Sequence, residues 1–329
     1  MMEASAIKRV IVTIVAVTVA AVMIFAIANL DNWFTEPWNG DDGTRSGTIY
    51  IDGAGYNPKT QTSYLLIVTD RLPGGIKLDG SPKDECVQAD IVALITFDHD
   101  AKEYRMLHLD RDTVAEINRP TETGADQGMN TETLSMMTRY GDGTHITAKS
   151  AMSSVSRLMY GMSIERYIMT DMDTFIALAN RFSDVELTVE HDLSHRDPRL
   201  SVGAEVSFGK DAELLRAFLS ADGVPANNSG ARAQRVRAYL DALMLDMEEM
   251  SPENSYIDGI YTEYENGAVT TDCHLSGLHG FFSYVRDYSY KGVISPEGMY
   301  TDRAAIDEYN MDKESLESIL KAYYYDEIK

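Results

Sequence analysis

The fold of this chain is decided by Tyr64-Leu-Leu-Ile-Val-Thr-Asp70-Arg71 and by two further stretches of the same kind. The second is Gln88-Ala-Asp90, which lies directly before the apolar run Ile91–Phe97. The third is Asp110-Arg-Asp-Thr113, which follows Tyr104–Leu109. Short apolar runs of this length are typical of buried strands. Charge at the ends of such strands lies at the rim of a sheet, where ligands bind in open α/β folds.

The charged side chains at this predicted rim suit a metal-bridged pyrophosphate. Asp70 and Asp90 are carboxylates, which Mg²⁺ prefers, and Arg111 can bind phosphate oxygens in a bidentate manner. Arg111 and Asp112 precede a strand-like segment, and strand alternation predicts that one faces the site while the other supports the structure. Two plainer interpretations stay open: a surface ion pair of Arg111 with Asp112, and a cap or turn role for Asp90.

A second basic group opens a predicted long helix at residues 231–247. Arg232 and Arg235 are three residues apart and therefore share a helix face, with Arg237 close behind them. The start of a helix favours anions, and two arginines would strengthen that preference. The alternative is a solvated basic face. We find no serine or cysteine nucleophile with a matched base and no glycine-rich phosphate loop.

The rest of the chain alternates strands and helices, which predicts an α/β fold with a mixed central sheet and helices on both faces. The hairpin of residues 91–97 and 104–109 supplies two strands, and residues 164–170 supply another. Asp171 or Asp173 is expected to cap the helix that follows. Further helices are predicted at residues 131–140, 147–160, 211–219, 275–288 and 312–325, and polar loops at residues 72–85 and 118–130.

The N-terminus contains Val10–Leu30, a run of 21 residues without a charge. As a helix it would span about 30 Å, close to the hydrocarbon thickness of a bilayer. Lys8 and Arg9 favour a cytoplasmic N-terminus. A cleaved signal peptide is the main alternative, because Ala26-Ile-Ala28 resembles a cleavage site. We predict a cytoplasmic segment 1–9, a transmembrane helix 10–30, a linker 31–47 and an extracellular domain 48–329.

The composition limits the partners of this domain. The chain has 52 acidic and 29 basic residues and a net charge of −23, so it would repel nucleic acid. Cys86 and Cys273 could form one disulfide outside the membrane or remain two free thiols. No cysteine or histidine spacing indicates structural zinc.

Taken together, these segments resemble the LytR-CpsA-Psr (LCP) family of membrane-anchored envelope proteins, over about residues 48–290. The longest similarity runs from Gly161-Met-Ser-Ile-Glu-Arg-Tyr167 through Val185-Glu-Leu-Thr-Val189. Shorter ones match the family's "LLIG.DSR", "RSDTI", "IPRDT" and "R..RQ" segments, and they begin here at Tyr64, Gln88, Leu109 and Arg232.

The resemblance implies a phosphotransferase that moves a glycopolymer from a polyprenyl-pyrophosphate lipid to peptidoglycan. In this interpretation Asp70 and Asp90 hold Mg²⁺. Arg111 and Asp112 are catalytic: Arg111 neutralises charge on the transferred phosphoryl group, and Asp112 orients Arg111 or another group of the site. Arg71, Arg232 and Arg235 bind the pyrophosphate, and the lipid tail enters an apolar tunnel between the sheet and helices such as 147–160. The membrane anchor holds the site beside its lipid substrate.

The chain departs from the family pattern at three phosphate-binding positions. Gln88 and Val236 replace an arginine and a glutamine, and the segment 218–222 lacks the arginines of "YVRSR". Each charge-assisted hydrogen bond to phosphate contributes about 1.5–3 kcal/mol. Candidate replacements are Arg71, Arg105, Arg139 and Lys77. The alternative function is therefore a non-catalytic module that binds lipid or glycan, or a simple lipid pyrophosphatase.

Overall fold

The structure is a computed structural model, and it describes residues 47–70, 87–209, 211–220, 229–249, 254–303 and 306–328. The predicted transmembrane segment 10–30, Arg71, Lys77, Cys86 and the predicted loop 72–85 lie outside these residues. Cys273 is buried and unpaired by any disulfide within them. In the described part of the chain no helix combines the length and the hydropathy needed to cross a bilayer.

Six strands form a mixed central sheet in the order β11-β8-β3-β4-β5-β12. β4 is antiparallel to both of its neighbours, β3 and β5, whereas β8 is parallel to β3 and β12 is parallel to β5. This arrangement confirms the predicted mixed α/β sheet. The bounds are β3 Gln61–Thr69, β4 Ala89–Asp98, β5 Glu103–Leu109, β8 Arg166–Asp171, β11 Val269–Thr271 and β12 Ser289–Ile294.

The central strands are apolar on both faces, because each face is covered. In β4 every residue from Ala89 to Phe97 is buried, and its alternate side chains enter two separate cores. Ile91 and Ala93 pack into one core, while Val92 and Leu94 pack into the other. A strand buried on both faces is expected to form a continuous apolar run, and this is the pattern that the sequence shows.

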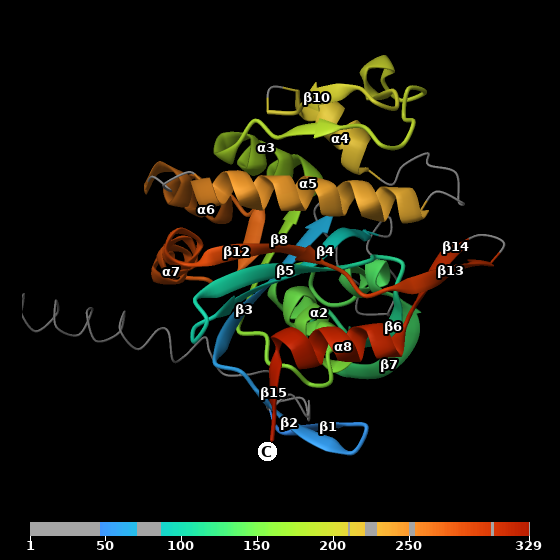
Figure 1. Cartoon of the computed structure of the whole chain (residues 1–329), viewed down its shortest axis with the longest axis vertical. Helices are drawn as coiled ribbons and strands as arrows, with labels where there is room; N and C mark the ends of the chain where they lie inside the picture. Colours follow the sequence, from blue (N-terminus) through green and yellow to red (C-terminus); the bar gives the residue numbers. More distant parts are fainter. Residues whose placement is uncertain are drawn as a thin grey trace, which may run out of the picture. The chain divides into compact units, whose positions relative to one another are not determined.

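Two helical layers cover the sheet (Figure 1). One core contains side chains of α3 (Met172–Phe182), α4 (Ala212–Leu219), α5 (Ser229–Glu249), α6 (Asn254–Glu265) and α7 (Leu275–Asp287). The other contains side chains of α2 (His145–Leu158), the 3-10 helix η1 (Leu134–Arg139) and α8 (Lys313–Tyr323). As predicted, Asp171 caps α3, its Oδ1 accepting a hydrogen bond from Thr174 N at 2.7 Å.

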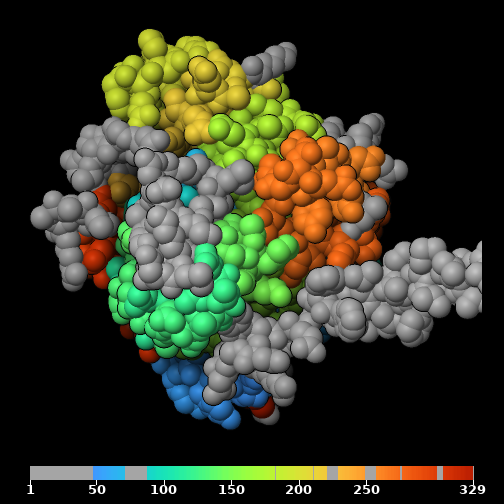
Figure 2. Space-filling view, turned by 180° about the vertical axis from the view of Figure 1, so that it is seen from behind, coloured from blue at the N-terminus to red at the C-terminus, as the bar shows by residue number. Residues whose placement is uncertain are grey.

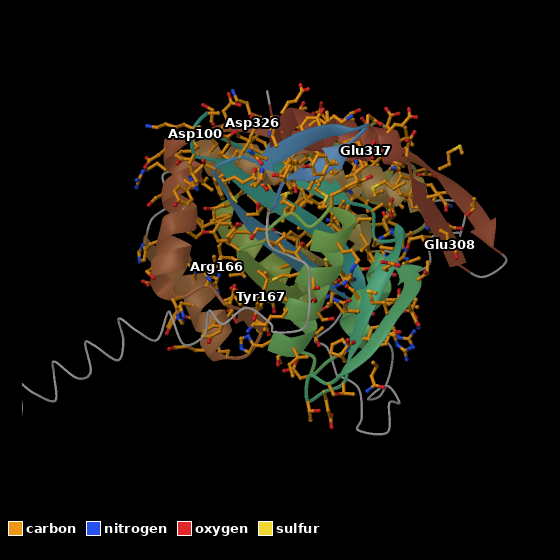
Figure 3. The ribbon with its side chains drawn as sticks, turned by 90° about the horizontal axis from the view of Figure 1, so that it is seen from below. Asp100, Arg166, Tyr167, Glu308, Glu317 and Asp326 are labelled. Carbon is orange, nitrogen blue, oxygen red and sulfur yellow. The ribbon has the colours of Figure 1, made fainter. Side chains whose placement is uncertain are left out.

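Smaller sheets surround this body. They are β1 (Ile49–Ile51), β2 (Ala54–Pro58) and β15 (Tyr325–Glu327); β9 (Glu186–Thr188) with β10 (Glu205–Ser207); β6 (Val114–Pro120) with β7 (Asp126–Thr133); and β13 (Gly298–Arg303) with β14 (Ile306–Met311). The 3-10 helix η2 covers Pro198–Leu200. Seen from behind, the yellow β9–β10 segment lies at the top and α6 (orange) at the right (Figure 2). The β13–β14 hairpin, marked by Glu308, projects from the side of the sheet away from Arg166 of β8 (Figure 3).

Two local predictions are wrong. Residues 118–130 were expected to form a polar loop, but they belong to the β6–β7 hairpin, which pairs Ile117 with Asn130 and Asn118 with Met129. Most of β7 is exposed, so its polar sequence has no apolar alternation to reveal it. The helix predicted at 131–140 begins as the end of β7 and continues as the 3-10 helix η1. The β6–β7 hairpin is held by backbone pairing, whereas η1 buries Leu134 and Met137 in the core.

Candidate functional site

The three charged stretches meet at one edge of the central sheet. The ends of β3 and β4 are held together by a hydrogen bond from Asp70 N to Gln88 O at 3.0 Å. The Oδ1 atom of Asp70 also accepts from Gln88 N at 3.2 Å. On the other side of β4, Val92 pairs with Leu109, so Asp90 lies opposite the turn that carries Arg111. The strand ends therefore bring Asp70, Asp90 and Arg111 to the same rim.

Arg111 is the centre of a buried ion-pair network. Its side chain is 9% exposed, and its Nη1 and Nη2 atoms donate hydrogen bonds to Asp90 Oδ1 and Gln88 Oε1. Its Nε atom lies 3.5 Å from Asp112 Oδ1. Burial and the nearby Arg232 lower the pKa of Arg111, while the two carboxylates act in the opposite direction. The isolated surface ion pair considered from the sequence is therefore excluded, and so is a simple turn role for Asp90.

Asp112 links the turn to α5. Its Oδ2 atom accepts a hydrogen bond from Arg232 Nη2 at 2.9 Å, across 120 residues of sequence. Its backbone N donates to Asp110 Oδ1 at 2.9 Å. Burial raises the pKa of Asp112, although Arg232 and Arg111 act to lower it. Asp112 therefore depends on both guanidinium groups to keep its negative charge.

The predicted separation of Arg111 and Asp112 onto opposite faces is wrong. A hydrogen bond from Thr113 N to Asp110 O at 3.0 Å closes a tight turn at this point. Strand alternation does not apply inside a turn, so both side chains face the same network. Both residues can therefore act on one ligand.

Arg232 and Arg235 point inward from the first turns of α5. Their side chains are 4% and 3% exposed, which rules out a solvated basic face for these two residues, whereas Arg237 is exposed. Arg235 Nε donates to Phe218 O at 2.9 Å, but its Nη1 and Nη2 atoms are buried without a hydrogen-bond partner in the described residues. Burial, with help from Arg232 and Arg196, lowers the pKa of Arg235 to about 10. A buried guanidinium with two such donors has the chemistry to bind an anion.

The departures from the family pattern have clear structural counterparts. Gln88 accepts a hydrogen bond from Arg111, so it positions that arginine rather than contributing a positive charge. Val236 and Phe218 are core residues of the α3–α7 layer. Arg105 stacks over the Tyr323 ring, 3.8 Å from its centroid, and is thus engaged away from this network. Arg139 approaches Met136 Sδ at 4.0 Å, and no contact joins it to the network.

Asp70 and Asp90 could hold a divalent cation only in part. In the described residues there is no group of three or more His, Cys, Asp or Glu side chains that could enclose a metal. Mg²⁺ commonly takes one or two carboxylates and completes its shell with water and substrate phosphates. Asp70 and Asp90 lie on adjoining strand ends, and Asp90 is paired with Arg111. Two carboxylates in this arrangement fit that second kind of site.

Sequence reasoning missed two residues next to the network. Tyr300, on β13, donates a hydrogen bond to Asp110 Oδ2 from 190 residues away. Asp110 stood in the quoted motif without a role, and it joins this tyrosine to the backbone of Asp112. No local pattern marks Tyr300, because only the chain path of the β13–β14 hairpin places it here.

His108 is buried beside this site at 3% exposure. Burial, reinforced by the charges of Arg232 and Arg237, lowers its pKa to about 3. The imidazole is therefore neutral near pH 7, and it adds no third positive charge to the two arginines. It can donate one hydrogen bond and accept another.

We expect His108 to make the fold sensitive to acid. Its folded pKa lies below the ordinary value of 6.5, so the unfolded chain binds more protons between pH 6.5 and 3. The contribution of neutral His108 to the free energy of unfolding is fully present above pH 6.5. It decreases as the pH falls, by about 2 kcal/mol at pH 5. Urea unfolding of the wild type and His108→Gln at pH 7 and pH 5 tests this. The wild type should lose more stability than the variant, whereas exposed His195→Gln should behave as the wild type. Equal losses for wild type and His108→Gln would contradict the assignment.

Comparisons with known proteins agree with this architecture. A model of the LytR_cpsA_psr family matches residues 57–324. Among solved structures, TagT bound to LIIa-WTA is 16% identical, with a TM-score of 0.54 over 79% of this chain and 88% of that chain. TagV of B. subtilis is 18% identical, with a TM-score of 0.53 over 80% and 96% of the two chains. YwtF (TagT) with bound octaprenyl pyrophosphate lipid is 16% identical, with a TM-score of 0.52 over 79% and 87%. These likenesses show the fold, and the curated proteins give no match.

Proposed function

Because the chain belongs to the LytR_cpsA_psr family, we propose that it is a membrane-anchored phosphotransferase. It would move a glycopolymer from a polyprenyl-pyrophosphate carrier to peptidoglycan. The observation that carries the proposal is the buried network of Arg111, Asp112 and Arg232 beside the two open Nη atoms of Arg235. Relatives of the same fold have been solved with LIIa-WTA and with octaprenyl pyrophosphate lipid.

The pyrophosphate is the part of the substrate that this network suits. Arg235 offers two buried donors that have no hydrogen-bond partner in the part of the chain that the structure describes, and phosphate oxygens would accept from them. Arg232, held in place by Asp112, adds a second positive charge on the same helix face. Desolvated charges of this kind interact strongly with an anion, which offsets the cost of burying them.

Arg111 neutralises the negative charge that develops on the transferred phosphoryl group during the reaction. Its guanidinium is bound to Asp90 and Gln88, and its Nε atom lies beside Asp112. We propose that a phosphate oxygen takes the place of Asp90 and that Asp112 keeps the guanidinium oriented. Negative charge on the transferred group is then stabilised by a group that is already desolvated.

The transfer itself exchanges one phosphorus–oxygen bond for another. An acceptor hydroxyl oxygen bonds to the phosphorus that carries the glycan. The bond to the polyprenyl phosphate breaks with its electron pair on the leaving phosphate, and the hydroxyl proton passes to water. Asp70 and Asp90 would hold Mg²⁺, which would neutralise pyrophosphate charge when bound.

Membrane attachment follows from the position of the substrate. Family members act at the cell envelope, and this substrate is held in the bilayer by its lipid. We propose that residues 10–30 form a single transmembrane helix with a cytoplasmic N-terminus, and that residues 48–329 lie outside the membrane. The apolar tail of the carrier would enter between the sheet and a helical layer.

One observation favours a second candidate, a module that binds the lipid or glycan without turnover. Both Nη atoms of Arg111 already have partners, and one of these is Gln88, which stands where the family has an arginine. A site that keeps Arg111 in these bonds would bind pyrophosphate through Arg232 and Arg235 alone. Hydrolysis of the lipid pyrophosphate is an intermediate case that needs fewer contacts.

The decisive experiment uses the full chain in detergent micelles with Mg²⁺, a polyprenyl-pyrophosphate-linked oligosaccharide and peptidoglycan. The proposal predicts covalent oligosaccharide on peptidoglycan together with release of polyprenyl phosphate. Release of phosphate-bearing products without a peptidoglycan adduct would instead show a pyrophosphatase. Tight binding of the lipid without either product would establish the binding module.

A further inference from the structure

A polar cavity lies beside the ion-pair network. Its volume is about 370 Å³, and it is bounded by the first turns of α5, the end of β5 and the β12–β14 region. Small-molecule sites occupy about 300–1,000 Å³, so the cavity is large enough for one or two sugar rings. Two family-like segments reach its wall, at Asp110 and at Ala233-Gln234, but the proposed pyrophosphate site gives these residues no role.

The cavity and the network share Asp110. This residue lines the cavity, while its two carboxylate oxygens accept hydrogen bonds from Asp112 N and from the Tyr300 hydroxyl. A second link is the hydrogen bond from Tyr309 N to Asp112 O at 2.7 Å. Because Tyr300 and Tyr309 also line the cavity, a molecule bound there would lie against the turn that carries Arg111 and Asp112.

The lining has the chemistry of a saccharide site. Tyr300 and Tyr309 present two aromatic rings whose centroids are 4.9 Å apart. Glu297 and Asp110 can accept hydrogen bonds from hydroxyl groups, and Arg237 can donate them. The two carboxylates would repel a pyrophosphate by like charge. The polar lining would not favour the burial of an apolar polyprenyl chain. A neutral or singly charged sugar ring satisfies all of these groups.

We propose that this cavity binds the acceptor saccharide, whose hydroxyl group receives the phosphoryl-linked glycan. This inference rests on the proposed transferase function. The buried, neutral His108 closes the cavity on the β5 side and can both donate to and accept from sugar hydroxyls. Asp110 then fixes the distance between the bound sugar and the network.

The test is isothermal titration calorimetry of the full chain in detergent with two probes. The first is a soluble tetrasaccharide of alternating N-acetylglucosamine and N-acetylmuramic acid, and the second is octaprenyl pyrophosphate without a sugar. Arg237→Gln and Glu297→Gln change exposed cavity side chains, so both variants should fold. Arg286→Gln and Glu186→Gln are matched controls outside the cavity.

We expect each cavity variant to weaken tetrasaccharide binding at least fivefold and to leave octaprenyl pyrophosphate binding within twofold of the wild type. Both controls should bind both probes as the wild type does. Tetrasaccharide affinity that is absent, or equal in all variants, would overturn the proposal. A third titration with an octaprenyl-pyrophosphate-linked disaccharide covers the donor sugar: if the variants weakened binding of this lipid and left tetrasaccharide binding unchanged, the cavity would hold the donor sugar and the proposal would be overturned. Failure of octaprenyl pyrophosphate to bind the wild type would contradict the proposed function alone, since the tetrasaccharide titration decides the cavity separately.

Discussion

Arg111→Ala is expected to lower the rate of phosphoryl transfer by about 10³-fold, because Arg111 is the guanidinium that pairs with both Asp90 and Asp112 and is proposed to neutralise the transferred group. The substitution also leaves those two carboxylates buried without their shared cation. Removing one partner of a buried ion pair costs about 3–5 kcal/mol. Turnover should therefore be measured at a temperature where the variant is folded, with unfolding followed in parallel by circular dichroism.

Two further variants separate the charge of Arg111 from its geometry. Arg111→Lys keeps a cation but cannot donate to Asp90 and Gln88 together, so it should restore much of the stability and little of the rate. Arg105→Ala removes an arginine from β5, the strand before the turn that carries Arg111; Arg105 stacks on Tyr323, so the rate should be unchanged. Undiminished transfer by folded Arg111→Ala would show that the chemistry takes place elsewhere.

Arg235→Met is expected to have opposite effects on stability and on binding. Both Nη atoms of Arg235 are buried without a hydrogen-bond partner among the described residues, and relief of this cost should raise the free energy of unfolding by about 1–3 kcal/mol. Methionine is also flexible enough to fill the space of the arginine stem. Binding of octaprenyl pyrophosphate should weaken by about 10²–10⁴-fold, since two charge-assisted hydrogen bonds of about 1.5–3 kcal/mol each are lost.

Such a trade between stability and binding identifies a functional residue, because a purely structural arginine would lose stability when replaced. Urea unfolding without lipid and calorimetric titration with lipid provide the two readouts. Val236→Ala serves as the neighbouring control on the same helix. Val236 is a core residue, so this variant should be less stable than the wild type and should bind the lipid with unchanged affinity. A destabilised Arg235→Met with unchanged lipid affinity would assign Arg235 to the core.

The central strands were predictable because their apolar runs are continuous and end in charge. The hairpin of β4 and β5 agrees with its prediction to within two residues, and so does β8 with its helix α3. Each of these elements has a strong local signal: a buried strand, or a helix with an aspartate cap. The rim position of Asp70, Asp90 and Arg111 follows directly from that strand pattern.

The interior of the site was less predictable because it depends on contacts between distant segments. The inward orientation of Arg232 is set by Asp112 across 120 residues, and helix spacing alone left a solvated face open. The contact between Arg111 and Asp112 depends on a tight turn just before the strand-like segment, where the prediction had assumed strand alternation. Tyr300 reaches Asp110 only because the β13–β14 hairpin returns to the end of β5. Long-range pairings of this kind have no periodic signature in one sequence.

The central claim, a pyrophosphate site formed by the sheet rim and α5, is tested most directly by octaprenyl pyrophosphate binding to the full chain in detergent. We predict binding that is strengthened at least tenfold by Mg²⁺ and that loses this dependence in Asp90→Asn. It should be weakened strongly in Arg235→Met. Wild-type binding that is absent, or that is unaffected by Mg²⁺ and by both substitutions, would contradict the account.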